Sequence, residues 1–227
     1  VVATARFVAS LGAARVAAFG YAHVPWMRKH QNAIDTALLP DAAERLRQAD
    51  AIEATLRAEG YVTIGMDHFA RPDDAMAVAA AAKALRRNFQ GYTTDAAPVL
   101  IPLGASAIGH TRRGFAQNDP DERRWLAAVE AGRFATARGI AVTDDDRLRA
   151  RLIETVMCTG AIARGDVPED VLAEALPRLE PLMADGLVVA DGQRLVATEE
   201  GLRFLRHFAA CFDAHLPTGG NRHSAAA

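Results

Sequence analysis

The fold of this chain is indicated first by residues 61–74, which read YVTIGMDHFARPDD. Tyr61–Met66 is apolar through its middle, a pattern that predicts a short buried strand. The polar pair Asp67-His68 follows that strand directly. Pro72, with acidic neighbours, then predicts the start of a helix that extends to about Leu85. A strand that leads through polar residues into a helix is typical of one βα unit.

Similar signals flank this stretch on both sides. Upstream, Arg15–Tyr21 predicts a buried strand, and Asp41–Glu59 predicts a helix with one apolar face and a C-terminal cap at Gly60. Downstream, Val99–Leu103 predicts another strand. This order predicts an α/β fold with parallel strands, as in a (βα) barrel, where chemistry gathers at the C-terminal ends of the strands. Three strands cannot close a barrel, so we expect the others upstream of Val1.

The pattern changes after residue 118, which divides a barrel part (1–118) from a second domain (119–217). The second part predicts helices, a hairpin at Asp191-Gly192 and a last helix capped by Thr198, an order typical of a winged-helix-like module. We expect residues 218–227, which are small and polar, to be a disordered tail. The other predicted helices of this domain are Asp119–Ala131, a helix after the capping box Thr143–Asp146, Pro168–Ala175 and Leu179–Ala184.

The composition limits the partners and the compartment. The net charge of the 227 residues is −2, which gives no electrostatic reason to expect a nucleic acid or a membrane as partner. Residues 143–213 contain fourteen acidic side chains against eight arginines and no lysine, a balance that opposes nucleic-acid binding by this module. The only cysteines, Cys158 and Cys211, lie far apart, and no secretory signal is visible. We therefore expect core thiols and a cytoplasmic protein.

Three segments with unusual residues follow predicted strands: Tyr21–Pro25 (YAHVP), Gly65–Asp74 (GMDHFARPDD) and Arg87–Thr94 (RNFQGYTT). Together they resemble the oxygen-independent coproporphyrinogen III oxidase family. Shorter matches, such as Gly104–Ile108 (GASAI), continue the resemblance, which extends from about Tyr21 to Asp213 and corresponds to the C-terminal half of that family.

The resemblance implies a radical-SAM enzyme of heme synthesis, built from an incomplete (βα) barrel and a C-terminal helical domain. Its cofactors would be S-adenosylmethionine (SAM) and a [4Fe–4S] cluster, and its substrate would be coproporphyrinogen III. We expect the protein to be a monomer. The chain departs from the family in one respect. The family's Cys-x-x-x-Cys-x-x-Cys cluster motif is absent, since Cys158 and Cys211 are not so spaced. We therefore expect the cluster ligands upstream, in a missing N-terminal half of the same protein.

The resemblance also carries over four site residues. Ala22 and Ile108 match SAM-contacting positions on the later strands, and Phe89 and Gln90 match positions that line the region of a second SAM molecule. It places neither a catalytic residue nor a metal ligand within this span.

Plainer interpretations stand beside these. Taken alone, Ala22 and Ile108 would be core residues, and His23 and His68 would be hydrogen-bonded histidines, because no third metal ligand is suitably spaced. Asp67 and His68 are adjacent, and adjacent strand residues point to opposite faces, so we expect no contact between their side chains. Arg71 and Arg87 could pair with substrate propionates. For Arg71, a structural ion pair with Asp73 or Asp74 is an equal alternative.

Two other functions stay open on the sequence. One is a heme-binding relative within the radical-SAM superfamily. The other is a non-catalytic fragment whose winged-helix-like module serves as an interaction surface.

Overall fold

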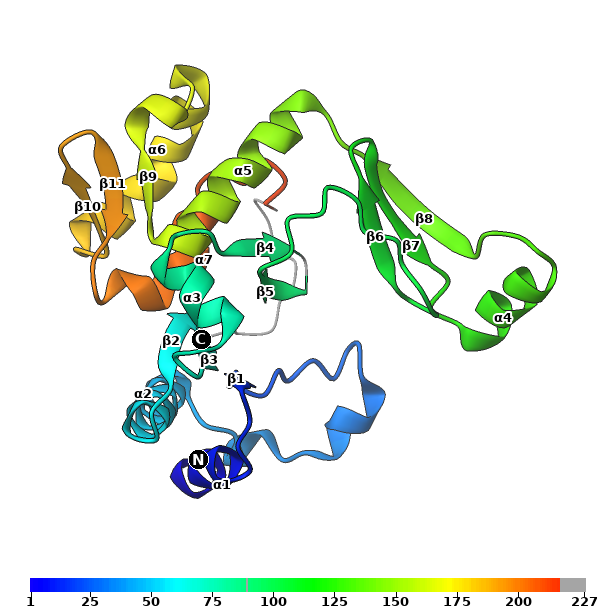
Figure 1. The fold of residues 1–227 in the computed structure, drawn as a ribbon, viewed down its shortest axis with the longest axis horizontal. Coiled ribbons are helices and arrows are strands. Elements are labelled where there is room, and N and C mark those ends of the chain that lie inside the picture. The colour runs from blue at the N-terminus through cyan, green and yellow to red at the C-terminus, as the bar shows by residue number, and fades with distance from the viewer. Residues whose placement is uncertain (89, 217–227) are drawn as a thin grey trace. The chain divides into compact units, whose positions relative to one another are not determined.

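The structure is a computed structural model that describes residues 1–88 and 90–216 (Figure 1). Phe89 and the predicted tail at 218–227 lie outside the described residues. The chain forms two compact units: the first joins Val1–Thr94 to Glu154–Ala227, and the second is Asp95–Ile153. These units differ from the predicted parts 1–118 and 119–217, whose boundary after residue 118 stays a prediction. Each unit is described by itself.

The first unit begins with a three-stranded sheet and two helices. The sheet has the order β1-β3-β2, and every pairing in it is antiparallel. Helix α1 lies beside α2 (Figure 1). The segments of this part are α1 (Val2–Ser10), β1 (Arg15–Ala17), η1 (Lys29–Ala33), η2 (Thr36–Leu38), α2 (Ala42–Ala58), β2 (Val62–Gly65), β3 (His68–Ala70), α3 (Ala75–Ala81), β4 (Arg86–Asn88) and β5 (Gly91–Thr93).

The prediction of parallel βα units is wrong for these strands. β2 and β3 are joined by a two-residue turn, Met66-Asp67, in which Met66 has a positive φ of 46°. A connection this short can join only antiparallel strands, because a parallel pair needs a crossover of a dozen residues or more. Across all described residues, every strand pairing is antiparallel.

Helix α2 confirms the predicted helix at Asp41–Glu59. The Asp41 carboxylate accepts a hydrogen bond of 2.7 Å from the Glu44 backbone N–H, as an N-cap does. At the other end Gly60 has a φ of +86°, the left-handed conformation of a C-terminal cap. Leu56, on the buried face of α2, is fully buried among Ala5, Ala9, Tyr61 and Phe69. This cluster joins the two helices to the sheet.

The rest of the first unit is the helix-rich C-terminal part. Its sheet has the order β10-β11-β9, with α6 packed against β10 (Figure 1). The aromatic rings of Phe208 and Phe212, both fully buried, lie 6.2 Å apart. The segments are α5 (Asp144–Thr159), which starts in the second unit, β9 (Ala161–Ala163), η3 (Arg164–Asp166), α6 (Glu169–Ala184), β10 (Val188–Asp191), β11 (Arg194–Ala197), η4 (Gly201–Phe204) and α7 (Leu205–Ala210).

The predicted local signals of this part are largely confirmed. Thr143 and Asp146 form the reciprocal capping box of α5: each backbone N–H donates to the other side chain, at 2.8 and 3.1 Å. The hairpin forms as β10 and β11, and the Thr198 hydroxyl accepts from the Gly201 N–H at 3.1 Å where the last helical segment begins.

Two predicted helices are in fact one. α6 is continuous through Pro177 and Pro181, although an interior proline removes a hydrogen bond and disfavours a helix. Val171, Ala175 and Leu179 are buried and recur every four residues across Pro177. The burial of this single apolar stripe offsets the proline cost and keeps the helix continuous through the break that the sequence predicts.

The second unit contains the antiparallel sheet β6-β7-β8 and helix α4 (Figure 1). The predicted strand Val99–Leu103 is wrong: it makes a single bridge, from Leu100 to His110, and no extended ladder. Pro102 explains this, because proline has no N–H to donate to a neighbouring strand. The segments are β6 (Ile108–Thr111), β7 (Gly114–Asn118), α4 (Glu122–Glu130) and β8 (Thr136–Ala141).

Within the described ranges, none of the helices has the length and apolar character needed to cross a lipid bilayer.

Candidate functional site

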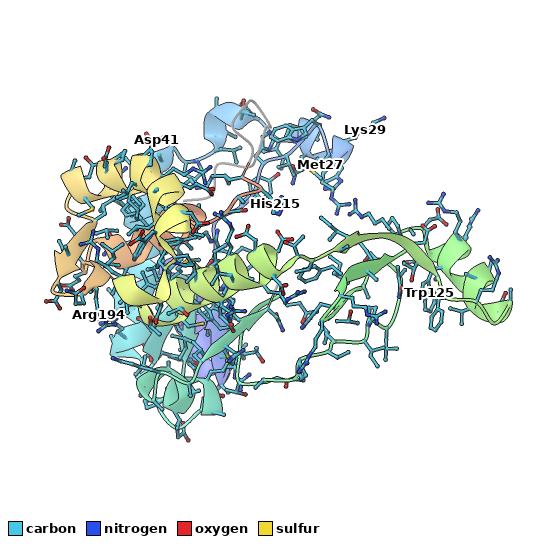
Figure 2. The ribbon with its side chains drawn as sticks, turned by 90° about the horizontal axis from the view of Figure 1, so that it is seen from above. Met27, Lys29, Asp41, Trp125, Arg194 and His215 are labelled. Carbon is cyan, nitrogen blue, oxygen red and sulfur yellow. The ribbon has the colours of Figure 1, made fainter. Side chains whose placement is uncertain are left out.

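The segment with Ala22 is held in place by one buried glutamine. The side-chain amide of Gln31 donates to the Ala22 carbonyl at 3.1 Å, and its oxygen accepts from the Val24 N–H at 2.6 Å. Gln31 is only 8% exposed, whereas Ala22 itself is exposed. Met27 and Lys29, on the chain that links these residues, are labelled in Figure 2. Ala22 is thus a surface residue on a fixed bend, and not the core residue of the plainer interpretation.

Gln31 was not singled out by its sequence, since a lone glutamine carries no pattern. We expect Gln31→Leu to loosen this bend, because it leaves the Ala22 carbonyl and the Val24 N–H without their partner. Each buried polar group left unpaired costs about 1–3 kcal/mol. Limited proteolysis should then cut residues 21–28 faster than in the parent chain. The matched control Gln48→Leu, at a half-buried glutamine of α2 that donates to Glu44, should leave this segment as resistant as before. Equal resistance of both variants would contradict the assigned role of Gln31.

Asp67 and His68 do form a contact, which corrects the sequence interpretation. His68 Nδ1 and Asp67 Oδ1 lie 2.7 Å apart. The rule of opposite faces does not apply, because Asp67 lies in the turn before β3 and only His68 belongs to the strand. Partial burial alone would raise the pKa of Asp67, but the hydrogen bond and electrostatic attraction of His68 outweigh it and lower the pKa. The carboxyl is therefore the acceptor and Nδ1 the donor.

Tyr92 packs against His68 from strand β5. The two rings meet edge to face, with centroids 5.3 Å apart. The Tyr92 hydroxyl donates to the Met157 carbonyl of α5 at 2.9 Å, and burial raises the pKa of Tyr92 to about 12. A Cβ on Gly65 would lie 2.4 Å from the Tyr92 hydroxyl oxygen, so only glycine fits there. Tyr92 is a protonated, anchored phenol, and the sequence marked it only as part of a motif.

Gln90 lies in the turn between β4 and β5. Its backbone N–H donates to the Asn88 side chain at 2.8 Å, and its own side chain is exposed. Gly91 follows with a φ of +141°, a conformation that side chains rarely adopt. The predicted partner Phe89 lies outside the described residues. The turn thus presents Gln90 to solvent from a two-stranded ribbon.

The two arginines considered for substrate propionates differ. Arg71 donates to the Glu59 carbonyl at 2.7 Å and lies 4.3 Å over the Tyr61 ring, which makes it structural. The ion pair that the sequence suggested between Arg71 and Asp74 is not observed. Asp74 pairs with Arg15 instead, at 2.9 Å. Arg87 lies 4.7 Å over the Tyr92 ring, and its buried Nη1 has no hydrogen-bond partner among the described residues.

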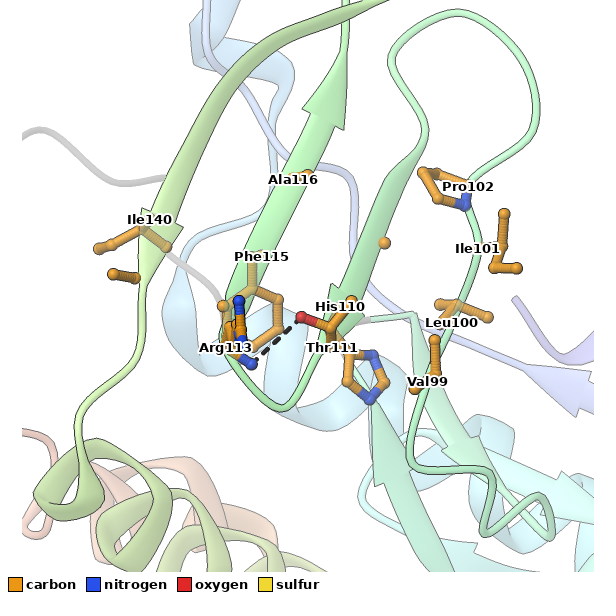
Figure 3. Close-up of a pocket in the computed structure, with 13 residues that line it drawn as sticks. Val99, Leu100, Ile101, Pro102, His110, Thr111, Arg113, Phe115, Ala116 and Ile140 are labelled. Carbon is orange, nitrogen blue, oxygen red and sulfur yellow. Dashed lines mark hydrogen bonds between the residues drawn. The ribbon is translucent and has the colours of Figure 1, made fainter. Parts of the chain in front are cut away.

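Ile108 belongs to the second unit, where it opens β6 opposite Gln117 and is half-buried. The structure therefore does not place it in the unit that holds Ala22 and Gln90. Next to it, Gly109 lines a shallow apolar groove with a volume of about 390 Å³ (Figure 3). The three predicted site residues that the structure describes, Ala22, Gln90 and Ile108, do not line this groove. The groove residues that Figure 3 labels include Val99, Leu100, Ile101, Pro102, Phe115 and Ile140.

The cysteines do not fit an iron–sulfur cluster. Burial raises the pKa of Cys158 and of Cys211 to about 11, which adds to the cost of forming the thiolates that bind a cluster. Cys158 packs against a core cluster around Ile64, and the Cys211 thiol donates to the His207 carbonyl at 3.3 Å. No group of three metal-binding side chains occurs in the described part of the chain.

Comparisons with known proteins agree with the predicted resemblance. Residues 142–204 match the HemN C-terminal domain. The oxygen-independent coproporphyrinogen III oxidase of Bradyrhizobium diazoefficiens is 49% identical over 219 residues, which is 93% of this chain and 48% of the relative. The oxidase of that name from Escherichia coli is 37% identical over 220 residues, with 94% and 48% covered.

A solved structure is similar as well. The coproporphyrinogen III oxidase (HemN) from Escherichia coli, described as a radical SAM enzyme, matches with a TM-score of 0.85 and 37% identity. The match covers 93% of this chain and 50% of that one. The chain thus spans about half the length of the relatives it matches.

Fold and matches together define an α/β protein whose residues 142–204 match the HemN C-terminal domain. The chain is similar to oxygen-independent coproporphyrinogen III oxidases over about half of their length.

Proposed function

We propose that this chain is part of an oxygen-independent coproporphyrinogen III oxidase. The reaction would convert two propionate side chains of coproporphyrinogen III to vinyl groups, giving protoporphyrinogen IX. One observation carries the proposal: the similarity to the Bradyrhizobium oxidase extends over 93% of the chain at 49% identity. In this function the chain would act together with the half of the same protein that binds the cluster. Residues 1–118 would form part of the barrel wall, and residues 119–217 a winged-helix-like domain.

The radical chemistry would come from SAM and a [4Fe–4S] cluster, which together supply the radical that takes a hydrogen atom from the propionate. The two cysteines do not fit the cluster, so its ligands belong outside this chain. The residues of this chain bind and orient. Ala22 and Ile108 would seat SAM, while Phe89 and Gln90 would shape the neighbouring region on the substrate side. Loss of carbon dioxide, with transfer of one electron from the substrate radical to an acceptor outside this chain, would then complete each vinyl group. We place the protein in the cytoplasm as a monomer, with coproporphyrinogen III as its substrate.

The exposed, rigidly held position of Ala22 supports this assignment. A small residue on a bend fixed by Gln31 lets a ligand approach the backbone closely, and the fixed bend keeps that surface in one shape. Gln90 is likewise exposed on a short ribbon whose turn is closed by Asn88.

The test is an anaerobic assay of the chain fused to the cluster-binding half of the Bradyrhizobium relative. After iron–sulfur reconstitution, addition of SAM, reductant and coproporphyrinogen III should yield protoporphyrinogen IX, measured by fluorescence after oxidation to the porphyrin. A fusion that binds its cluster and cleaves SAM, yet leaves coproporphyrinogen III intact, would contradict the proposed substrate. If heme alone binds in proportion to protein, the heme-binding alternative would replace it.

A further inference from the structure

We propose that His68 is a positioning residue that fixes the β4–β5 turn carrying Gln90. Asp67 holds the histidine ring, and the ring in turn holds the ribbon. The effect of this arrangement on turnover rests on the function proposed above, whereas its effect on the turn does not.

A chain of contacts within the first unit supports the proposal. Arg206 of α7 approaches Asp67 Oδ2 at 3.5 Å, and Asp67 Oδ1 accepts from His68 Nδ1 at 2.7 Å. The ring of His68 then meets the edge of Tyr92, whose hydroxyl is bonded to Met157 of α5. A side chain of β3 is therefore held between two helices and the strand β5. Two contacts fix the orientation of the His68 ring: its Nδ1 is hydrogen-bonded to Asp67, and the ring packs edge to face against Tyr92.

The far edge of the same ring faces the backbone of Gly91, the first residue of β5. A Cβ built on Gly91 would lie 3.5 Å from His68 Nε2 and 4.0 Å from Cε1, so the ring lines the space on that side of the glycine. Gly91 is buried, and it is the residue directly after Gln90. His68 thus packs against β5 through Tyr92 and stands beside Gly91, where the backbone takes its unusual positive φ.

Two plainer roles for His68 fit less well. A metal site needs at least three ligands, and among the described residues no group of three His, Cys, Asp or Glu side chains includes His68. A simple surface ion pair would leave the ring free to turn, whereas the side chain of His68 is only 25% exposed and that of Asp67 only 17%. Pairs with this geometry orient an imidazole, and here the oriented ring packs edge to face against Tyr92.

Substitution of His68 by asparagine or by glutamine tests the Nδ1 side and the Nε2 side of the ring separately. His68→Asn keeps an N–H near the place of Nδ1, so Asp67 retains its donor, but it removes the edge that reaches Gly91 and Tyr92. His68→Gln can instead extend its amide toward the place of Nε2. His30→Asn is the matched control, because His30 is exposed on η1.

The first measurement is amide hydrogen exchange by NMR in the full 227-residue chain. In His68→Asn the Gln90 amide should exchange about tenfold faster, because the turn opens locally. The Leu195 amide in β11 should not change, since the loss of one local support leaves the other sheet folded. His68→Gln should show a smaller acceleration, and His30→Asn none. Equal acceleration at Gln90 and Leu195 would indicate general destabilisation and overturn the proposal, as would an unchanged Gln90 amide.

The second measurement uses the fusion with the cluster-binding half. His68→Asn should lower kcat/KM for coproporphyrinogen III by about tenfold or more at unchanged iron content, because small misplacements of a positioning group are costly. Unchanged kcat/KM would overturn the link between the turn and the substrate. A parent fusion that is inactive toward coproporphyrinogen III would contradict the proposed function, while the exchange experiment would still decide the role of His68.

Discussion

Replacing Ala22 with tryptophan is expected to abolish vinyl formation by the fused enzyme while its iron–sulfur cluster stays in place. The indole would fill the space next to the bend that we assign to SAM. A displaced SAM cannot direct its radical at the propionate carbon, and a misplacement of about 1 Å already costs a factor of about 100 in rate. We therefore expect at least this loss of protoporphyrinogen IX formation, together with weaker SAM binding measured by equilibrium dialysis.

The structure makes this substitution informative because it should not unfold the chain. Ala22 is exposed, so the new ring need not enter the core, and the carbonyl of residue 22 can keep its bond to Gln31. The matched control is Ala37→Trp, an exposed alanine of η2 outside the proposed site. The control should turn over normally. Normal SAM affinity and full turnover in Ala22→Trp would show that the position assigned to Ala22 is wrong.

Helix ends were predictable from the sequence because their signals are local. Asp41 and Gly60 bound α2 as predicted, and Thr143 with Asp146 caps α5, since a cap needs only a side chain and an N–H within the same turn. The hairpin at Asp191-Gly192 follows the same logic. In each case the residues that make the structure are neighbours in the sequence.

Strand direction was not predictable in this way. Tyr61–Met66 reads as an apolar strand whether its partner is parallel or antiparallel, and the two-residue turn at Met66 decides between them. β8 was missed because all six of its residues, Thr136–Ala141, are exposed, so no apolar alternation marks it. α6 shows the opposite case, in which tertiary burial outweighs the local signal of Pro177.

Only those residues of the candidate site that lie in family motifs could be predicted from the sequence. Family resemblance pointed to Ala22, Gln90 and Ile108, but not to the residues that support them. Gln31 lies nine residues from Ala22, and Tyr92 lies far from His68 in sequence, so neither pairing has a spacing signal. The Asp67–His68 contact was even excluded by the alternation rule, which fails where a strand gives way to a turn.

The 227-residue chain by itself is expected to bind no stoichiometric [4Fe–4S] cluster and to cleave no SAM after reconstitution with iron and sulfide. A cluster is held by grouped thiolates. Here the two thiols lie in separate packing environments, and burial raises the pKa of both to about 11, which adds to the cost of forming thiolates. Absorbance near 400 nm that scales with protein, together with SAM cleavage under dithionite, would contradict this expectation.

Cys158→Ala gives the contrasting test in the fused enzyme. If Cys158 is a core residue packed against the cluster around Ile64, its replacement should lower the free energy of unfolding by about 1 kcal/mol and leave the iron content unchanged. A ligand would behave in the opposite way, since its loss would remove iron while the protein stays folded. Thermal unfolding and iron analysis of the same sample therefore separate the two roles. A folded Cys158→Ala fusion without its cluster would place this thiol among the cluster ligands.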